Sequence, residues 1–493
     1  MATRTAAHTP AHHIRLSEPR LWREQAWVAG KWIDSRDAIA VDDPATGVTI
    51  GHVPALGAKA IDSAIDAASV ALPAWAALTP DLRAEHLLAW YEGMLRHRED
   101  LALIMTLEEG KPLHEARGEI DYAASFVRWF AEEGRRAYGE TIPSHLPGRH
   151  LSTVRRPIGV TAAITPWNFP SAMVTRKAAA ALAAGCPMIV RPASETPFSA
   201  LALAWLAEQA GIPGSIFQVI TGDGRTVGGA LMDDVRIRAL SFTGSTEVGK
   251  ALIRQSADTV KRLTLELGGN APFIVFDDAD LDFAVEGALA AKFQTSGEDC
   301  LAANRILVQR PLYEAFLERF AARTAQLRVG HGLETGTEIG PLIDSRAVDK
   351  AAQHVEDAQR HGARVLTGGK KLGGNFYSPT VVADVTPEMA LFREETFSPV
   401  AAVLPFDDEA EAIRLANDTE YGLVAYCYTE NLGRATRLGE ALDYGMVAIN
   451  CAKLTGPPIP FGGVKQSGQG REGSRHGLDE YSELKYICLG LPD

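Results

Sequence analysis

Cys300 and Glu266 are two residues whose chemistry could be combined. Cys300 lies in the run FQTSGEDCLAANR, and Glu266 lies in the run LELGG earlier in the chain. A thiolate can add to an aldehyde carbonyl, hydride can then leave to a nicotinamide, and a carboxylate can activate the water that releases the acid. Each signal is weak alone, because a lone cysteine is most often a small buried residue. The hypothesis therefore depends on matching groups elsewhere in the chain.

Three further segments carry such groups. Asn168, in the proline-braced run TPWNFP, could bind the oxyanion of a tetrahedral adduct together with a backbone N–H, although asparagine there is also a common turn former. Gly244 and Ser245 follow an apolar run and precede a helix, whose free N–H groups favour a pyrophosphate. Glu395, in the run EETFSP, could accept hydrogen bonds from ribose hydroxyls or could simply lie in a solvated loop.

Length and composition restrict the class of protein. A chain of 493 residues is too long for a single core, so two or three domains are expected. A hydrophobic content of 46% and a charged content of 23% are ordinary for a soluble globular protein. The net charge of -13 argues against nucleic acid as a partner, because no basic surface remains to neutralise phosphates.

The cysteines and the termini indicate a compartment. The 5 cysteines are scattered, without a CxxC pair, which excludes a disulfide framework and a cysteine zinc knuckle and fits a reducing cytoplasm. The uncharged run Ala178–Val190 is too short to span a bilayer, so no membrane partner is expected. Residues Met1–Leu16 lack an apolar secretion core and are interpreted as a loose tail, with a transit peptide as the alternative.

The order of periodic segments predicts the fold. Residues 58–137 are typical of amphipathic helices, and Gly139–Pro157 is typical of two strands and a turn. Apolar runs that precede helical patterns then form a first series of strands, at Gly159–Thr165, Pro187–Arg191, Ile216–Thr221, Ala239–Thr243 and Ala271–Phe276. A second series follows Cys300, at Arg305–Gln309, Arg364–Thr367, Val400–Phe406, Leu423–Tyr428 and Val447–Asn450. This pattern predicts an α/β protein with two doubly wound, Rossmann-like parallel sheets.

Taken together, six runs in this order resemble the aldehyde dehydrogenase superfamily over nearly the whole chain. These runs are PWNFP at 166–170, FTGS at 242–245, LELGG at 265–269, GEDC at 297–300, EETF at 394–397 and PFGG at 460–463. The runs SAMVTRK at 171–177, PFGGVKQSGQGREG at 460–473 and DEY at 479–481 resemble the succinate-semialdehyde dehydrogenase branch in particular.

This resemblance implies a division of the chain and an assembly. A cofactor-binding domain would comprise residues 1–138 and 159–266, and a catalytic domain residues 267–473. Residues 139–158 and 474–493 would form a small β oligomerisation element. The family typically forms homodimers or homotetramers, so one of these is expected.

The resemblance also implies roles for single residues. Cys300 would be the nucleophile, Glu266 the general base, Asn168 the oxyanion donor and Lys177 a supporting catalytic residue. The dinucleotide, NAD or NADP, would be lined by a further set, Trp167, Gly244, Ser245, Glu395 and Phe397. No metal is implied.

Departures from the family pattern lie beside the nucleophile and in the ribose-binding run. Glu298 and Asp299 stand where glutamine and its neighbour are common, and two carboxylates so close disfavour a thiolate unless they point away. Ala302 stands where many succinate-semialdehyde enzymes have a second cysteine, so a redox disulfide is not expected. Ser398 replaces a usual glycine.

Two positions predict the cofactor preference. Members of the family that prefer NAD often carry a glutamate at the position of Ser194, and that carboxylate repels a 2′-phosphate. Ser194 removes the repulsion, and Arg191, where lysine is usual, adds a planar cation suited to phosphate. NADP is therefore expected to be accepted and preferred, unless the neighbouring Glu195 turns into the same place.

Three positions predict the substrate. By resemblance, Arg176 and the hydroxyl of Thr455 would bind the distal carboxylate of a semialdehyde, because a buried carboxylate needs a cation. Gln294 stands where the branch usually has a second arginine, which removes one charge-assisted contact. Succinate or glutarate semialdehyde is the expected substrate, with weaker discrimination against uncharged aldehydes. The alternatives are a dehydrogenase of uncharged or varied aldehydes, a CoA-acylating dehydrogenase and a non-catalytic protein of the same fold.

Overall fold

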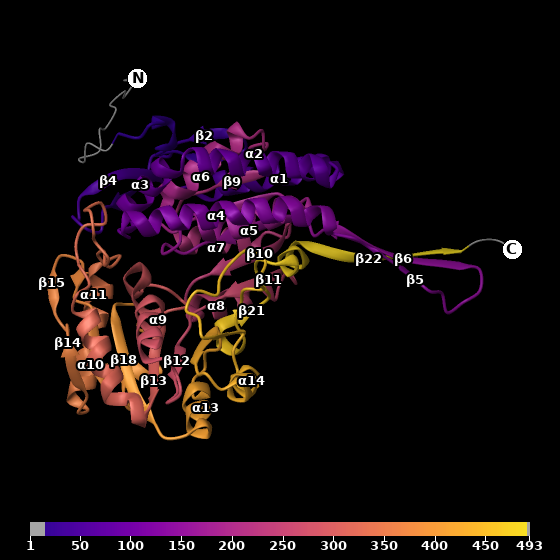
Figure 1. Ribbon diagram of the computed structural model, residues 1–493. Helices are drawn as coiled ribbons and strands as arrows, with labels where there is room; N and C mark the ends of the chain where they lie inside the picture. Colours follow the sequence, from indigo (N-terminus) through magenta and orange to yellow (C-terminus); the bar gives the residue numbers. More distant parts are fainter. Residues whose placement is uncertain (1–14, 491–493) are drawn as a thin grey trace.

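The computed structural model describes residues 15–490, so nearly all of the predicted N-terminal tail lies outside it. Two large, mostly parallel sheets flanked by helices make up the body, and a long narrow sheet projects from it (Figure 1). The predicted fold class is therefore confirmed. The first sheet lies in the part of the molecule formed by the N-terminal half of the chain, and the second lies beside it (Figure 1).

The first sheet has the strand order β2-β1-β9-β8-β7-β10-β11-β21. Its central strands are parallel, and β1, β2 and β21 pair antiparallel at the edges. The strand bounds are β1 (Ala26–Val28), β2 (Lys31–Ile33), β7 (Val160–Ile164), β8 (Met188–Arg191), β9 (Phe217–Val219), β10 (Ile237–Thr243), β11 (Arg262–Glu266) and β21 (Gly468–Gln469). The predicted strands of the first series match β7 to β10, whereas β11, which ends at Glu266, was not predicted.

The second sheet has the strand order β14-β17-β18-β13-β12-β19-β20. Its strand bounds are β12 (Ala271–Val275), β13 (Ala303–Gln309), β14 (Arg364–Thr367), β17 (Thr380–Ala383), β18 (Val400–Phe406), β19 (Val424–Tyr428) and β20 (Met446–Ile449). All five strands predicted after Cys300 are present. The interpretation of Ala271–Phe276 as a member of the first series was wrong, because β12 pairs with β13 and β19.

Helices cover both sheets and match the predicted helical region at 58–137. Their bounds are α1 (Ala58–Ala77), α2 (Pro80–Arg96), α3 (Arg98–Glu109), α4 (Leu113–Glu133), α5 (Ala172–Ala184), α6 (Pro197–Gln209), α7 (Gly224–Asp233), α8 (Thr246–Ser256), α9 (Leu281–Phe293), α10 (Tyr313–Thr324), α11 (Ser345–Arg360), α12 (Ala390–Arg393), α13 (Glu409–Asn417) and α14 (Leu432–Ala441). Local chemistry sets several helix ends. Thr79 caps α2 and Pro80 follows it, while α5 ends at Gly185 in the left-handed conformation.

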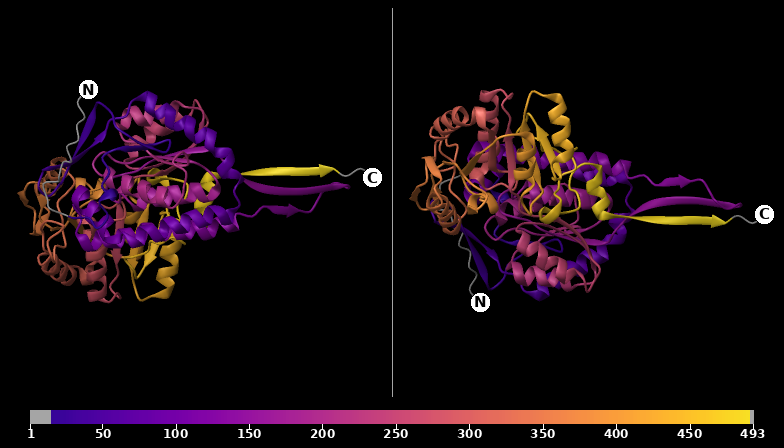
Figure 2. Two further views of the ribbon diagram at one scale, coloured as in Figure 1. Left: turned by 90° about the horizontal axis from the view of Figure 1, so that it is seen from above. Right: turned by 90° about the horizontal axis from the view of Figure 1, so that it is seen from below.

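The projecting sheet, here called the arm, consists of β5 (Glu140–Ile142), β6 (Arg149–Pro157) and β22 (Ser482–Gly490), paired antiparallel. It confirms the two strands and turn predicted at 139–157, and both views of Figure 2 show it extending away from the body. Large apolar side chains are exposed on it, namely Ile142, Val154, Leu484, Tyr486, Ile487 and Leu489. A sheet with so much exposed apolar surface is typical of a region that packs against another chain.

The apolar cores follow the two sheets. One pair of buried clusters packs around the first sheet and helices α1 to α8, and another pair packs around the second sheet and helices α9 to α14. The predicted boundary after residue 266 falls between β11 and β12, which belong to different sheets. Within residues 15–490 no single helix is long and apolar enough to cross a membrane. Among these residues, only α1 and α2 taken together, a sharply bent pair, have the length and apolar composition of a membrane span.

Two small antiparallel pairs complete the fold. They are β3 (Ala38–Asp42) with β4 (Thr49–Pro54), and β15 (Lys371–Gly373) with β16 (Phe376–Tyr377).

Candidate active site

A cavity of about 1090 Å³ lies where the two sheets and helices α4 and α5 meet. It is lined by loops that follow β7, β10 and β20 and by the segment after α9. The carboxyl ends of parallel strands meet at this edge of each sheet, which is where ligands of doubly wound folds bind. Ten of the predicted site residues line it: Trp167, Asn168, Arg176, Gly244, Ser245, Gln294, Cys300, Glu395, Phe397 and Thr455.

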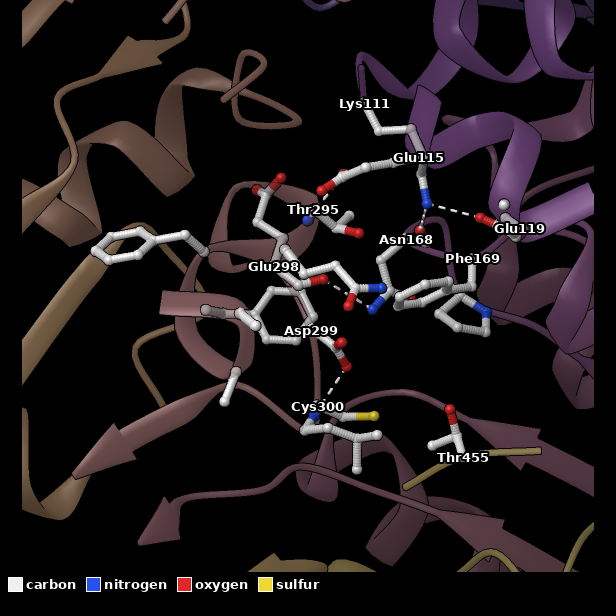
Figure 3. Close-up of a pocket in the computed structure, with 18 of the residues that line it drawn as sticks. Lys111, Glu115, Glu119, Asn168, Phe169, Thr295, Glu298, Asp299, Cys300 and Thr455 are labelled. Atoms are coloured by element: carbon white, nitrogen blue, oxygen red, sulfur yellow. Dashed lines mark hydrogen bonds and ion pairs between the residues drawn. The ribbon is translucent and has the colours of Figure 1, made fainter. Parts of the chain in front are cut away.

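A strained turn presents Cys300 to this cavity. Thr295 and Ser296, directly after α9, both have left-handed backbones, with φ of 49° and 55°. A Cβ on Gly297 would lie 2.3 Å from the carbonyl oxygen of Ser398, so only glycine fits there. The turn leaves the Cys300 side chain partly exposed in the open part of the site (Figure 3).

The surroundings of Cys300 disfavour its thiolate form. Burial raises its pKa well above the usual value, and the carboxylates of Glu266, Asp299 and Glu395 act in the same direction. The two carboxylates noted beside the nucleophile have backbone partners. Asp299 Oδ1 accepts the Leu301 N–H at 2.9 Å, and Glu298 Oε1 accepts a backbone N–H at 3.1 Å.

Asn168 is buried beside this turn and is held from both sides. Its Nδ2 donates to the backbone carbonyl oxygen of Glu298 at 2.9 Å, and the backbone carbonyl oxygen of Asn168 accepts from Lys111 Nζ at 2.7 Å (Figure 3). Lys111 Nζ also contacts Glu119 Oε2 at 2.6 Å. The amide of Asn168 is therefore rigid, and one of its two N–H groups remains for a ligand in the cavity.

A buried ion cluster lies directly behind the cavity wall. Arg176 Nη2 contacts Glu266 Oε2 at 2.9 Å, and Arg176 Nε contacts Glu472 Oε2 at 2.6 Å. Lys177 Nζ forms an ion pair with Glu472 and donates to Thr243 Oγ1 at 2.8 Å. Two cations thus face two carboxylates, so the charges of the cluster of Arg176, Lys177, Glu266 and Glu472 cancel when all four groups are ionised.

Glu266 has the protonation behaviour of a base that works near neutral pH. Burial raises its pKa to about 7, with Arg176 opposing this rise and Glu472 adding to it. Its Oε2 is anchored by Arg176, whereas its Oε1 is buried without a hydrogen-bond partner among the described residues. Glu266 does not itself line the cavity, but it lies close enough to Cys300 to raise the pKa of the thiol.

Two of the predicted substrate residues, Arg176 and Thr455, meet at one end of the cavity. Arg176 lines it with its guanidinium 4.1 Å from the ring centroid of Phe461, and Gln294 and Thr455 line it as well. The hydroxyl of Tyr122, on α4, lies near Thr455 and Arg176. The charge of Arg176 is already balanced by Glu266 and Glu472, which the sequence did not indicate.

The residues predicted for a dinucleotide lie at the other end and fit that group. Ser245 caps α8 by accepting the Val248 N–H, so the first N–H groups of α8 face this end, as a pyrophosphate requires. Glu395 Oε1 accepts the Gly269 N–H at 2.8 Å, which leaves its Oε2 for a hydroxyl. The rings of Trp167 and Phe397 meet edge to face with centroids 5.6 Å apart.

Arg191 and Ser194 lie outside the lining of this cavity, at the carboxyl end of β8. Arg191 Nη2 donates to Ser194 Oγ at 2.9 Å and to the carbonyl oxygen of Gly222 at 3.1 Å. A Cβ on Gly224, the first residue of α7, would lie 3.4 Å from the same guanidinium. A cation, a hydroxyl and a helix start are therefore close together, as a phosphate requires.

Several residues of the site were missed in the sequence. The sequence around Tyr122 is typical of the apolar face of a helix. The sequence around Lys111 and Glu119 is typical of a solvent-exposed face. Glu472 belongs to a run that resembled the family, but no role was assigned to it. Contacts such as those of Lys111 with Asn168 and of Glu472 with Arg176 join residues distant in the chain, so no local pattern could show them. Among residues 15–490 no group of three His, Cys, Asp or Glu could hold a metal ion.

Known proteins share this sequence and this fold. The aldehyde dehydrogenase family pattern matches residues 32–487. The chain is 58% identical over 480 residues to the aspartate-semialdehyde dehydrogenase (non-phosphorylating) of Halomonas elongata, covering 97% of each protein. It is 54% identical over 482 residues to the NADP(+) succinate-semialdehyde dehydrogenase of Escherichia coli, covering 97% of this chain and 100% of that protein.

The same likeness holds in three dimensions. The crystal structure of succinate-semialdehyde dehydrogenase from Burkholderia pseudomallei is 51% identical, with a TM-score of 0.96, covering 97% of this chain and 100% of that one. The chain therefore belongs to the aldehyde dehydrogenase family, as an enzyme similar to the succinate-semialdehyde dehydrogenase branch.

Proposed function

We propose that this protein oxidises an ω-carboxylated semialdehyde, such as succinate or glutarate semialdehyde, to the acid, with NADP as its preferred cofactor. The observation that carries the proposal is the pairing of Cys300 with Glu266. The thiol is partly exposed in the cavity, and the nearby carboxyl has a pKa of about 7 and one free buried oxygen.

In this mechanism Cys300 adds to the aldehyde carbon as its thiol proton passes to a carboxylate. The amide of Asn168 donates to the oxygen that becomes negative in the adduct. The dinucleotide, when bound, supplies the acceptor for the hydride that leaves this carbon. Glu266 then takes a proton from water, the water oxygen attacks the thioester that remains on Cys300, and the acid is released. Aldehyde, water and oxidised cofactor are consumed, and acid, reduced cofactor and protons are formed.

The preference for NADP is supported by the surroundings of Ser194. Arg191, Ser194 and the start of α7 form a group that suits a 2′-phosphate, and no carboxylate occupies position 194. The relative from Escherichia coli carries NADP(+) in its name.

The substrate class is supported by the polar end of the cavity, where Tyr122, Arg176 and Thr455 meet. A second candidate, aspartate semialdehyde, is favoured by a different observation. The carboxyl groups of Glu115 and Asp299 line the cavity without an ion pair in the described part of the chain, so an ammonium group would find partners there.

We also infer an assembly, a division of the chain and a compartment. The exposed apolar face of the arm supports a homodimer or homotetramer, and the two sheets support a cofactor-binding and a catalytic domain divided near residue 266. The scattered cysteines support the cytoplasm.

A variant series tests the mechanism. Cys300→Ala is expected to abolish oxidation, and Glu266→Gln is expected to give one burst of NADPH without steady turnover, because only water activation is lost. Steady turnover in Glu266→Gln at the wild-type rate would refute the role of Glu266. Omission of CoA should leave the wild-type rate unchanged, and a strict need for CoA would favour the acylating alternative.

A substrate panel tests the specificity. Succinate, glutarate and aspartate semialdehydes are compared with pentanal through kcat/KM with NADP and with NAD. Higher kcat/KM for one of the carboxylated aldehydes supports the proposal. Equal or higher values for pentanal would show an enzyme for uncharged aldehydes.

A further inference from the structure

The cations around the cavity are nearly all balanced by carboxylates. Arg176 contacts Glu266 and Glu472, and Lys111 contacts Glu119. Arg323, at the rim, pairs bidentately with a glutamate on α9. Lys350 donates to the backbone oxygen of Glu395 and so belongs to the cofactor end. A substrate with a distal carboxylate therefore meets little net positive charge from these groups.

Lys453 differs from them. It lines the cavity, its side chain is exposed, and it has no ion pair in the part of the chain that the structure describes. Its neighbours Leu454 and Thr455 line the same cavity, and Thr455 lies at the end where Tyr122 and Arg176 meet. Lys453 is thus a lysine ammonium without a carboxylate partner, two residues from the predicted substrate hydroxyl.

The segment that carries Lys453 is fixed at both ends. At its start, Asn450 Nδ2 donates to the carbonyl oxygen of Thr429 at 2.8 Å, and Asn450 Oδ1 accepts the Thr429 N–H at 3.0 Å. At its end, the Ser474 N–H donates to the carbonyl oxygen of Pro457 at 2.6 Å. The segment 451–456 is therefore anchored on both sides, while the long side chain of Lys453 can adjust to substrates of different length.

We propose that Lys453 is the specificity-determining residue that binds the distal carboxylate of the substrate, in place of the arginine that position 294 lacks. This proposal rests on the proposed function and identifies the residue whose positive charge binds the substrate carboxylate. Gln294, exposed at the same cavity, can only donate a neutral hydrogen bond. Arg176 then holds Glu266 and Glu472 in position, and Lys453 adds the positive charge that no carboxylate of the described residues balances.

The test compares Lys453→Met, which keeps the length of the side chain, and Lys453→Arg, which keeps the charge. With succinate semialdehyde, Lys453→Met is expected to raise KM about tenfold with little change in kcat, and Lys453→Arg is expected to restore most of the loss. With pentanal neither change should alter KM. The wild-type KM for succinate semialdehyde should rise with salt, and this dependence should be weaker in Lys453→Met.

Lys59→Met is the matched control, because Lys59 is an exposed lysine on α1 that does not line the cavity. Equal effects of Lys453→Met on both aldehydes, or no effect on either, would overturn the inference. The proposed function fails separately, if wild-type protein does not prefer a carboxylated aldehyde over pentanal. If wild-type protein has that preference and Lys453→Met retains it, only the role of Lys453 is wrong.

Discussion

Replacement of Glu472 by glutamine would test whether the buried ion cluster tunes the base. Glu266 and Glu472 bind two nitrogens of the same guanidinium, so their carboxylates repel each other across Arg176. This repulsion is one cause of the raised pKa of Glu266. In Glu472→Gln it is lost, and the pKa of Glu266 should fall from about 7.

The size of the fall follows from Coulomb's law. Two unit charges roughly 6 Å apart at an effective dielectric constant of about 20 interact by about 3 kcal/mol. This energy corresponds to about two pKa units. Relaxation of the cluster will reduce the effect, so a fall of about one unit or more is expected for Glu266.

The assay is the dependence of kcat on pH. A base must be deprotonated to activate water, so kcat of the wild type should rise with pH through about 7, the pKa of Glu266. In Glu472→Gln this rise should occur at lower pH. Thermal melting should show a loss of stability too, because Lys177 loses its ion pair, and breaking a buried pair costs about 3–5 kcal/mol.

Glu480→Gln is the matched control. Glu480 lies on the same C-terminal segment and binds Thr264 Oγ1 at 2.8 Å, but it does not contact Arg176 or Lys177. The Glu480→Gln substitution should leave the dependence of kcat on pH unchanged. A folded Glu472→Gln protein with the wild-type pH profile would refute the reasoning, because Glu472 would then have no influence on the base.

Three further results are expected. Arg191→Ala should weaken NADP binding about tenfold or more and NAD binding less, because a charge-assisted bond to the 2′-phosphate is lost, and calorimetric Kd values that change equally would contradict this. Asp299→Asn should lower the pKa of Cys300 by removing a nearby negative charge, so alkylation of the thiol by iodoacetamide near neutral pH should become faster; a slower reaction would speak against it. Paired aspartate substitutions of Leu484 and Tyr486 on the arm should reduce the mass measured by light scattering to that of a monomer, and an unchanged mass would exclude the arm as the contact.

The sequence predicted those parts of the fold that depend on local pattern. Apolar runs such as Val400–Phe406 are buried on both faces of a parallel sheet, so composition alone reveals them. It did not reveal β11, whose run RLTLE mixes charged, polar and apolar residues, nor the sheet to which β12 belongs. Sheet membership depends on pairing between distant segments, which no local run encodes.

The same distinction applies to the site. The motif residues that line the cavity were found because each has a recognisable neighbourhood in the sequence. The pairing of Arg176 with Glu472 could not be found, because the two residues are brought together only by the packing of the C-terminal segment against α5. The balanced charge of Arg176, and with it the importance of Lys453, became visible only in three dimensions.

The antiparallel pairing of β21 with β11 has a consequence for the order of biosynthesis. β11 is the last parallel strand of the first sheet, and its outer edge is covered by Gly468 and Gln469. A Cβ on Gly468 would lie 1.9 Å from the carbonyl oxygen of Leu265, so this close cover requires glycine. During synthesis on the ribosome, the outer edge of β11 therefore stays unpaired until all strands of the second sheet and then β21 have been synthesised.

An open edge is a template for wrong pairing, so the nascent chain should be most exposed to aggregation and to chaperones during this interval. The C-terminal segment that contains β21 also carries Glu472, a member of the ion cluster, and continues into β22 of the arm. Release of a truncated chain would thus leave the sheet edge, the cluster and the arm incomplete together. Nascent chains stalled before residue 468 should accordingly bind holdase chaperones, and those stalled after the arm has emerged should not.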